Sequence, residues 1–274
     1  MLKLASFLPH ILNLQGDFAN AKAMQKIAEA HGISCQLDII DTTDLANFRF
    51  TNYDMVFMAS GEVEQFVYIK RQLEQHALLD DLKEFIAQGK VLLACGTTVA
   101  LFAQYIELQN GEKCEGLGIL PIEAKERTHI YADDVISRVQ IKDRTLHLWG
   151  AQVQLVDFTQ VSGAKEALST HAKPFGELLY GYGDNGKTKT EGWQLGNAIF
   201  TLLHAPLLVY NPWLGSALIH SYCEAEINPS MKALDFSAEQ ECARNFCTYV
   251  VNKPQGFASY KAPDLATIDL KLEA

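Results

Sequence analysis

Short apolar runs alternate with segments of helical periodicity in the first hundred residues, and this alternation constrains the fold more than any other feature. The apolar runs, which have the length of buried strands, are Met1–Phe7, Ser34–Ile40, Tyr53–Met58 and Val91–Ala94. Helical spacing marks Ala21–His31 and Phe66–Ala87, and Gly32 stands where a helix C-cap is expected. Strands and helices joined in this order by short turns are typical of a parallel sheet with helices on both faces.

The second half of the chain has a different pattern. Strand-like segments separated by Gly, Asn and Asp turns are Val135–Ile141, Leu146–Val156, Leu178–Gly181 and Ala198–Leu203. This spacing favours antiparallel pairing. Further helices are predicted at about Thr98–Tyr105, at Leu214–Glu224, and from Ser237 to about Val251, where Ser237 and Gln240 form a capping-box pattern.

We therefore expect an α/β fold with a central, mostly parallel sheet, an antiparallel extension in the second half and helices on both faces. No internal repeat or linker divides the chain. We assign residues 1–230 to one domain and residues 231–274 to a C-terminal helix and extension.

Charge and cysteine usage exclude several classes of protein. Lys and Arg number 23 against 33 Asp and Glu, a formal net charge of −10, which argues against a nucleic acid partner because phosphates require a basic stripe. No run of about 18 apolar residues is present, so we expect no membrane span. The six cysteines, none with metal-ligand spacing, are Cys35, Cys95, Cys114, Cys223, Cys242 and Cys247. We expect no bound metal and a reducing, cytoplasmic location.

The segment Val91–Gly96 predicts a nucleophile. A buried strand there turns sharply at Cys95 and Gly96 into a helical segment, which would expose the sulfur at the carboxyl end of the strands. The helix N-terminus would favour the thiolate, and the Gly96 N–H could stabilise an oxyanion. The alternative is that Cys95 is a small buried residue at a strand end.

His204 is the candidate base. It lies within an apolar segment, Leu202–Leu208, where a polar side chain is expected to have a hydrogen-bond partner or a functional role. A Cys–His pair needs only to meet in space, so the separation of the two residues along the chain is no obstacle. The alternative is a core histidine whose hydrogen bonds are satisfied.

A third motif, Gly181–Thr188, matches the phosphate-binding pattern G-x-x-x-x-G-K-T. A true phosphate loop opens a helix, whereas Lys189–Gly196 contains two glycines and lacks apolar helical periodicity. We therefore predict a hairpin turn that binds no nucleotide.

Together, several segments carry a family resemblance. They are Leu12–Asn20, Ala94–Gly96, Gly116–Leu120, Leu179–Gly186 and Asn197–Leu208, followed by Asn211–Pro212. The sequence resembles the class I glutamine amidotransferases of the cobyric-acid-synthase type, and within them the stand-alone glutaminase subunit of lipid II isoglutaminyl synthase. The resemblance runs from about residue 8 to residue 225. It implies a flavodoxin-like glutamine amidotransferase fold.

The resemblance also implies a reaction. Cys95 would attack the side-chain amide of glutamine, and His204 would act as base and then protonate the departing ammonia. Hydrolysis of the glutamyl thioester would follow. Ammonia would pass to a separate Mur-ligase-like subunit, which would use ATP and magnesium to amidate the D-glutamate of the peptidoglycan precursor lipid II. The chain itself would need no cofactor and would form a heterodimer.

The remaining site residues follow from the same resemblance. The second oxyanion donor is expected in the loop Ala59–Glu62, which gives Ser60, Gly61 and Glu62 as candidates. Where the family places an arginine near the active site, this sequence offers Arg127, with His129 as the alternative, as the candidate for substrate binding. The loop has fewer glycines than is usual in the family. Thr97, Thr98 and Val99 replace a family segment that includes a glutamine.

These departures support an alternative function. A chain with the same fold but degenerate chemistry could serve as a partner or scaffold subunit. The third residue of a catalytic triad is also missing from its usual place. In typical triad amidotransferases a glutamate stands two residues after the histidine, whereas here Ala205 and Pro206 follow His204. The orienting acid must then come from elsewhere in the chain or from the partner.

Overall fold

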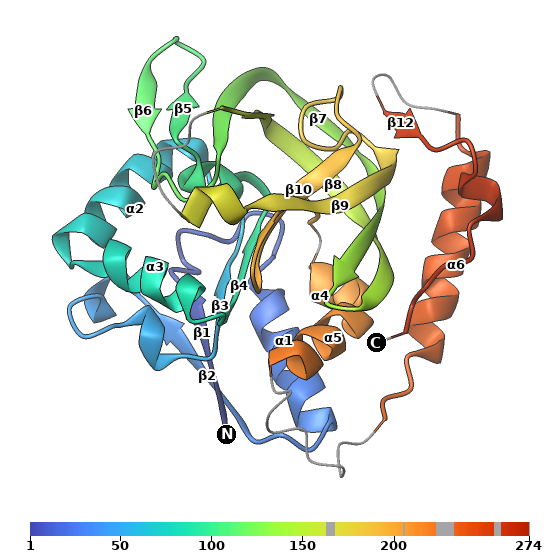
Figure 1. The fold of residues 1–274 in the computed structure, drawn as a ribbon, viewed down its shortest axis with the longest axis horizontal. Coiled ribbons are helices and arrows are strands. Elements are labelled where there is room, and N and C mark those ends of the chain that lie inside the picture. The colour runs from blue at the N-terminus through green and yellow to red at the C-terminus, as the bar shows by residue number, and fades with distance from the viewer. Residues whose placement is uncertain (163–167, 205, 223–232, 255–258, 274) are drawn as a thin grey trace.

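The computed structural model describes residues 1–162, 168–204, 206–222, 233–254 and 259–273. Within these residues, twelve strands form one sheet, and ten of them follow the order β2-β1-β3-β4-β11-β10-β9-β7-β5-β6. β8 is added beside β7, and β12 beside β9. The sheet divides into a parallel part and an antiparallel part (Figure 1).

The parallel part carries the predicted strands of the first half. Its members are β1 (Leu2–Phe7), β2 (Cys35–Ile40), β3 (Met55–Met58), β4 (Val91–Cys95) and β11 (Ala198–Thr201). β11 pairs with β4 in parallel, with Thr201 opposite Cys95. A strand from the second half thus completes the parallel part and brings the segment before His204 beside the end of β4.

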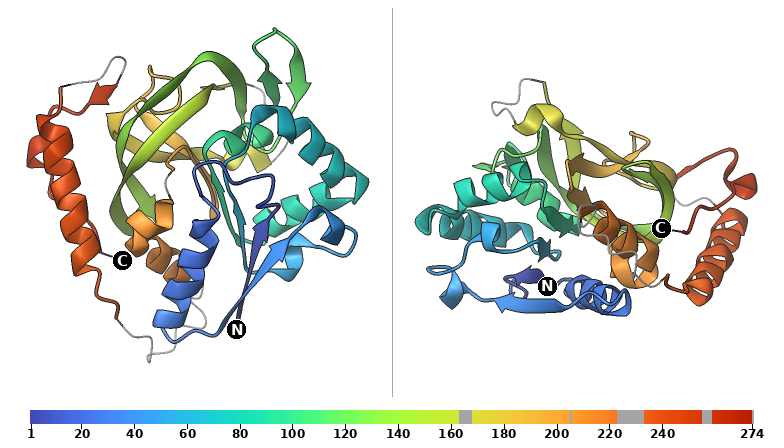
Figure 2. Two further views of the ribbon diagram at one scale, coloured as in Figure 1. Left: turned by 180° about the vertical axis from the view of Figure 1, so that it is seen from behind. Right: turned by 60° about the horizontal axis from the view of Figure 1, so that its bottom comes forward.

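Helices cover both faces of the parallel strands (Figures 1 and 2). α1 (Ala19–Ala30) and α5 (Pro212–Tyr222) pack on one face, and α2 (Val63–Gln75) and α3 (Leu78–Ala87) on the other. Successive side chains of a strand point to opposite faces, so Leu93 and Cys95 join the core beneath α1 while Leu92 and Ala94 face α2 and α3. Gly32 has a φ of +85°, as expected for the residue that ends α1. The α/β prediction is confirmed.

The antiparallel part differs in detail from the prediction. β7 (Ile122–Ile141) and β8 (Arg144–Gln160) form a long hairpin, and β9 (Lys173–Gly181) and β10 (Thr190–Leu195) link it to β11. No strand is predicted from the sequence at the position of β10. β7 begins well before the predicted start at Val135. The prediction missed its first half because that half is mostly exposed and polar and contains a register shift between Glu126 and Tyr131, so it lacks the alternation of a half-buried strand. The remaining strands are β5 (Tyr105–Glu107), β6 (Lys113–Glu115) and β12 (Tyr260–Lys261).

Two predicted helices are corrected. The segment after Cys95 is a short 3₁₀ helix over Gly96–Phe102, so it lacks the macrodipole of an α-helix, and β5 begins at Tyr105. α6 (Ser237–Asn252) forms, but the predicted capping box does not: Asp235 accepts the Ser237 N–H at 2.9 Å, and Gln240 donates to Leu272 O at 3.0 Å. The last residues of the predicted Leu214–Glu224 helix, the boundary at residue 230 and Cys223 lie outside the described residues. Other short helices are α4 (Leu207–Tyr210) and 3₁₀ turns at Thr42–Asp44, Phe50–Asn52, Leu168–His171 and Leu265–Thr267.

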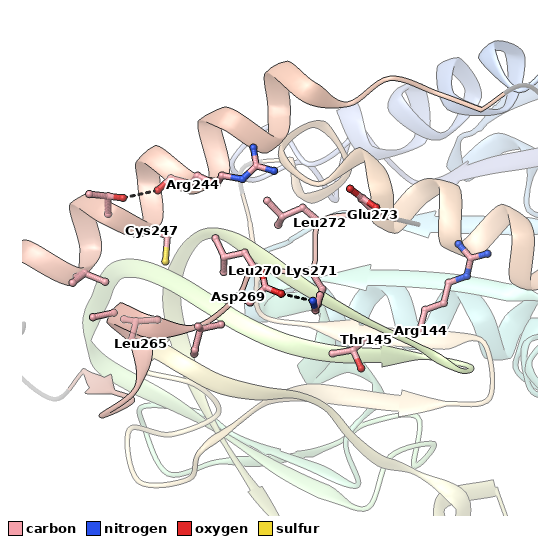
Figure 3. A pocket seen from close by; sticks show the side chains of 14 residues that line it. Arg144, Thr145, Arg244, Cys247, Leu265, Asp269, Leu270, Lys271, Leu272 and Glu273 are labelled. Carbon is pink, nitrogen blue, oxygen red and sulfur yellow. Dashed lines mark hydrogen bonds and ion pairs between the residues drawn. The ribbon is translucent and has the colours of Figure 1, made fainter.

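The C-terminal segment packs against the antiparallel part. Leu265 and Leu272 are buried, and Lys271 exchanges hydrogen bonds with His147 of β8 at 2.7 and 2.8 Å. A wide pocket of about 890 Å³ lies between α6, the C-terminal residues and the end of the β7–β8 hairpin (Figure 3). None of the predicted site residues lines it. In the described part of the chain, no helix is long and apolar enough to cross a membrane.

Candidate active site

The nucleophile candidate lies at the end of β4. Cys95 is 1% exposed, and Gly96 follows it with a φ of +63°, a conformation that side chains with a Cβ rarely adopt. A Cβ added at Gly96 would lie 1.9 Å from His204 Cε1, 2.6 Å from His204 Nε2 and 2.6 Å from Ser60 Oγ. Glycine is therefore required here, because the imidazole occupies the space that any other side chain would take.

His204 reaches this position from the segment after β11. Its backbone N–H donates to Ala151 O of β8 at 2.8 Å, and its side chain is almost completely buried. The imidazole Nδ1 lies 3.0 Å from Asp17 Oδ2. The structure thus brings Cys95, Gly96, Ser60 and His204, four of the seven predicted site residues, to one edge of the sheet.

Asp17 was not predicted as a site residue. It lies 187 positions before His204, in the loop between β1 and α1, and its side chain is fully buried. A carboxylate only accepts hydrogen bonds, so Asp17 fixes the proton of a neutral imidazole on Nδ1 and leaves Nε2 free to accept another. Asp17 therefore supplies the orienting acid that the residues after His204 lack.

Asn20, at the start of α1, joins the nucleophile to the segment after His204. Its side-chain N–H donates to Cys95 Sγ at 3.6 Å, and its Oδ1 accepts the Leu208 N–H at 2.8 Å. Asp17 and Asn20 lie three residues apart, so the end of the β1–α1 loop and the first turn of α1 position both the base and the sulfur. The sequence signal for both residues was the segment Leu12–Asn20, which carried part of the resemblance.

The electrostatics of Cys95 differ from the expected activation by a helix N-terminus. Burial raises the pKa of the Cys95 thiol well above its ordinary value, and the carboxylates of Asp17 and Glu191 raise that pKa further. The resting sulfur is therefore protonated. A base must remove this proton as the sulfur attacks, which is the role that the Nε2 of His204 can fill.

The loop after β3 lies beside Gly96. Ser60 Oγ accepts the Thr97 N–H at 3.2 Å, and Thr98 Oγ1 donates to Ala59 O at 2.7 Å. A Cβ at Gly61 would lie 2.4 Å from Leu12 Cδ2, so this glycine permits close packing. Glu62 is exposed and directly precedes α2.

Arg127 has other partners. One guanidinium nitrogen contacts both oxygens of Asp157 at 2.8 and 2.9 Å, and the same nitrogen contacts the Tyr182 hydroxyl. The guanidinium also donates to His129 O at 3.1 Å. These contacts tie Arg127 to the β7–β8 hairpin and to the residue after β9.

The cavity beside the catalytic candidates is small. About 10 Å³ is enclosed by Gly96, Thr97 and His204 on one side and by Val153–Val156 and Phe158 of β8 on the other, with Leu202 completing the wall. This space holds about one water molecule. Residues Val153–Val156 and Phe158 of β8 form one of its walls, so the position of β8 determines its size.

Two further buried carboxyl groups lie behind the site. Glu191 Oε1 accepts from Thr201 Oγ1 and from the Leu202 N–H, each at 2.6 Å. Asp184 accepts from Thr190 Oγ1 at 2.5 Å and from the Gly192 N–H at 2.8 Å. Burial raises the pKa of Glu191 to about 7 and the pKa of Asp184 to about 8.

These raised pKa values predict that the free energy of unfolding falls as pH rises from 6 to 8. Protonation of both groups stabilises the folded chain below their unfolded pKa values, and this contribution is lost as pH passes about 7 for Glu191 and about 8 for Asp184. We expect a slope on the order of 1 kcal/mol per pH unit for each group in its window, measured by urea unfolding. Asp184→Asn should flatten the dependence. A free energy that stays level or rises over this range would contradict the assignment.

The phosphate-loop-like motif forms the connection between β9 and β10. Asn185 Oδ1 accepts the N–H groups of Lys187 and Thr188, each at 3.1 Å. The element that follows is the strand β10, so no helix N-terminus points at these residues. In the described residues, no group of three or more His, Cys, Asp or Glu side chains is arranged to hold a metal ion.

Comparison with known proteins gives relatives over most of the chain. No protein-family model matches the sequence. The GatD subunit of lipid II isoglutaminyl synthase (glutamine-hydrolyzing) from Streptococcus pneumoniae is 28% identical over 80% of this chain and 79% of its own. The subunit of the same name from Staphylococcus aureus is 26% identical over 87% of this chain and 91% of its own.

Solved structures give looser likenesses. A crystal structure of a glutamine amidotransferase covers 80% of this chain and 98% of its own, with 14% identity and a TM-score of 0.47. A glutamine amidotransferase from Thermotoga maritima covers 92% and 99%, with 12% identity and a TM-score of 0.46. The two GatD subunits confirm the resemblance that was predicted from the sequence. The chain is similar to these subunits over at least four fifths of its length.

Proposed function

We propose that this chain is the glutaminase subunit of a two-chain amidotransferase. It releases ammonia from glutamine and passes it to a separate Mur-ligase-like subunit, which amidates the D-glutamate of lipid II. Both GatD relatives are named as subunits of a glutamine-hydrolyzing lipid II isoglutaminyl synthase. The observation that carries the proposal is the convergence of Gly96, His204 and Asp17 at Cys95.

The residues support a thiol mechanism. His204 Nε2 takes the proton from Cys95 as Sγ attacks the side-chain carbon of the glutamine amide, while Asp17 stabilises the imidazolium through Nδ1. The tetrahedral intermediate then expels ammonia, which receives that proton from Nε2. Water hydrolyses the resulting thioester, which yields glutamate and restores the Cys95 thiol. The Gly96 N–H and the loop Ala59–Glu62, whose Ser60 lies beside Gly96, are the candidate donors to the oxyanion.

A partner has a clear role in this scheme. The enclosed space at the site holds about one water, so glutamine gains access only when β8 or its neighbours move. Association with the ligase can drive this opening and couple ammonia release to its use. ATP and magnesium belong to the ligase in this scheme. The five described cysteines are free thiols, which suits a reducing cytoplasm.

Ammonia release from glutamine tests the proposal directly. We expect low turnover from the chain alone and at least about a tenfold increase when the Mur-ligase-like partner is added, because opening of the closed site depends on association. A reactive diazo-ketone analogue of glutamine should label one cysteine per chain, located at Cys95 by peptide mass spectrometry. Bovine serum albumin in place of the ligase is the control.

A scaffold function is the second candidate, and the closed cavity and the protonated resting thiol of Cys95 favour it. Under that function, the chain binds the ligase but neither releases ammonia nor reacts with the analogue. Stable complex formation with both chemical readouts negative would overturn the glutaminase proposal and leave the scaffold function in place.

A further inference from the structure

Glu191 is a buried charged residue that the thiol mechanism does not use. It lies on β10 with 0% exposure, one strand away from β4 in the order β4-β11-β10. One carboxyl oxygen accepts two hydrogen bonds, from Thr201 Oγ1 and the Leu202 N–H, while the other, Oε2, is buried without a hydrogen-bond partner. Burying a carboxyl in this way costs free energy, which calls for a compensating role.

The two hydrogen bonds hold the segment that carries His204. β11 ends at Thr201, and the next three residues leave the regular sheet. Their N–H groups are satisfied one by one: Leu202 by Glu191 Oε1, Leu203 by Thr201 Oγ1 at 3.2 Å, and His204 by Ala151 O at 2.8 Å. Because Thr201 Oγ1 itself donates to Glu191, the first two of these contacts depend on that one carboxyl group.

The position of His204 tolerates little error. Its imidazole lies where a Cβ of Gly96 would be, and its Nδ1 must remain within hydrogen-bond distance of Asp17. A shift of the backbone at Leu202 moves the ring away from both. Misplacement of a catalytic group by about 1 Å can lower a rate by about 10²-fold.

Glu191 also lies close to the reacting pair, because Thr201, which donates to its carboxyl group, is opposite Cys95 in the pairing of β11 with β4. Its charge raises the pKa of Cys95, and His204 in turn lowers the pKa of Glu191. Glu191 also raises the pKa of Asp184, which accepts the N–H of Gly192 at 2.8 Å. The carboxyl group is thus connected to the site in two ways, by hydrogen bonds to the His204 segment and by charge to Cys95.

We propose that Glu191 is a positioning residue for His204, acting through Thr201 and Leu202, and that its buried carboxyl group makes the thiol of Cys95, the register partner of Thr201, less reactive. This inference rests on the proposed glutaminase function for its catalytic consequence. Its effect on Cys95 does not depend on that function.

Two substitutions separate the two effects. Glu191→Gln keeps an oxygen that can accept from Thr201 and Leu202 but removes the charge, so we expect iodoacetamide to alkylate Cys95 about tenfold faster at pH 8, as for a pKa lowered by about one unit. Glu191→Ala removes the oxygen that accepts both hydrogen bonds, so we expect ammonia release by the complex to fall by about 10²-fold. Alkylation is measured at Cys95 by peptide mass spectrometry, because other cysteines also react.

The controls keep the inference falsifiable. Glu177→Gln, an exposed glutamate of β9 opposite Thr190, should change neither readout. If Glu191→Ala does not fold, Thr201→Val removes one of the two hydrogen bonds to Glu191 and also the acceptor of the Leu203 N–H. It should lower ammonia release by about 3- to 10-fold, a loss on the order of one or two hydrogen bonds. The rate of Cys95 alkylation against pH is the decisive readout, because a purely structural role would leave this profile in place.

The inference is overturned if folded Glu191→Ala retains wild-type ammonia release, or if Glu191→Gln has the alkylation profile of Glu177→Gln. Failure of the proposed function is distinguishable: the wild-type complex then releases no ammonia, while Glu191→Gln still accelerates alkylation of Cys95 and so supports the placement of the carboxyl group.

Discussion

Cys95→Ala is expected to lower ammonia release from glutamine by at least about 10³-fold in the complex with the ligase. Without the sulfur no thioester can form, and neither the oxyanion donors nor His204 can replace the nucleophile. The fold should persist, because Cys95 is a small member of the core beneath α1 and alanine keeps its Cβ. Ammonia is measured by a coupled dehydrogenase assay, and the thermal midpoint of each variant verifies folding.

Cys247→Ala is the matched control for this experiment. Cys247 is also a buried free thiol, but it lies on α6 and lines the pocket of Figure 3, so its loss should leave turnover unchanged. Wild-type turnover in Cys95→Ala would mean that the nucleophile lies elsewhere. Loss of turnover in both variants would mean that the assay reports stability rather than chemistry.

The sequence predicts the parallel part of the fold well because its signals are local. β3 and β4 are buried on both faces, so each appears as a short continuous apolar run between polar turns, and β1 has the same character apart from the exposed Lys3 and the buried Ser6. Gly32 ends α1 with a positive φ, a requirement that only glycine meets without strain. Signals of this kind need no knowledge of distant residues.

The antiparallel part is harder to predict for a physical reason. β7 is partly exposed, and the register shift between Glu126 and Tyr131 breaks its alternation, so only its buried end, near Val135–Ile141, resembles a strand. β10 contains Glu191 and Gly192, which are unusual in a buried strand. There, Gly192 has a φ of +68° and Glu191 holds the His204 segment, so long-range contacts override local preference.

The residues of the candidate active site also fall into those that local sequence signals predict and those that depend on long-range contacts. Cys95 and Gly96 can be identified from the sequence because a strand turns sharply there, and His204 can be identified from its apolar surroundings. Asp17 carries no such signal, because its partner lies 187 residues away. The rule that could have found it is topological: loops after parallel strands meet at one sheet edge, and Asp17 follows β1 as Cys95 ends β4.

Asp17→Asn is expected to lower ammonia release by about 10²- to 10⁴-fold, with Cys95 still present. An asparagine side chain can present its N–H₂ group to Nδ1, which would place the imidazole proton on Nε2, and Nε2 could then no longer accept the thiol proton. The carboxylate that stabilises the imidazolium is lost as well. Initial rates against glutamine concentration measure the effect, which should fall mainly on kcat.

The exposed Asp80 of α3 provides the control, since Asp80→Asn makes the same change in charge at a position away from the site. Equal rates in the Asp17 and Asp80 variants would remove Asp17 from the mechanism. The split between kcat and KM separates orientation of the imidazole from simple loss of structure. If the 3.0 Å contact between Asp17 Oδ2 and His204 Nδ1 orients the base, Asp17→Asn should lower kcat while KM stays near that of the wild type. A misfolded site would instead change both constants and lower the thermal midpoint.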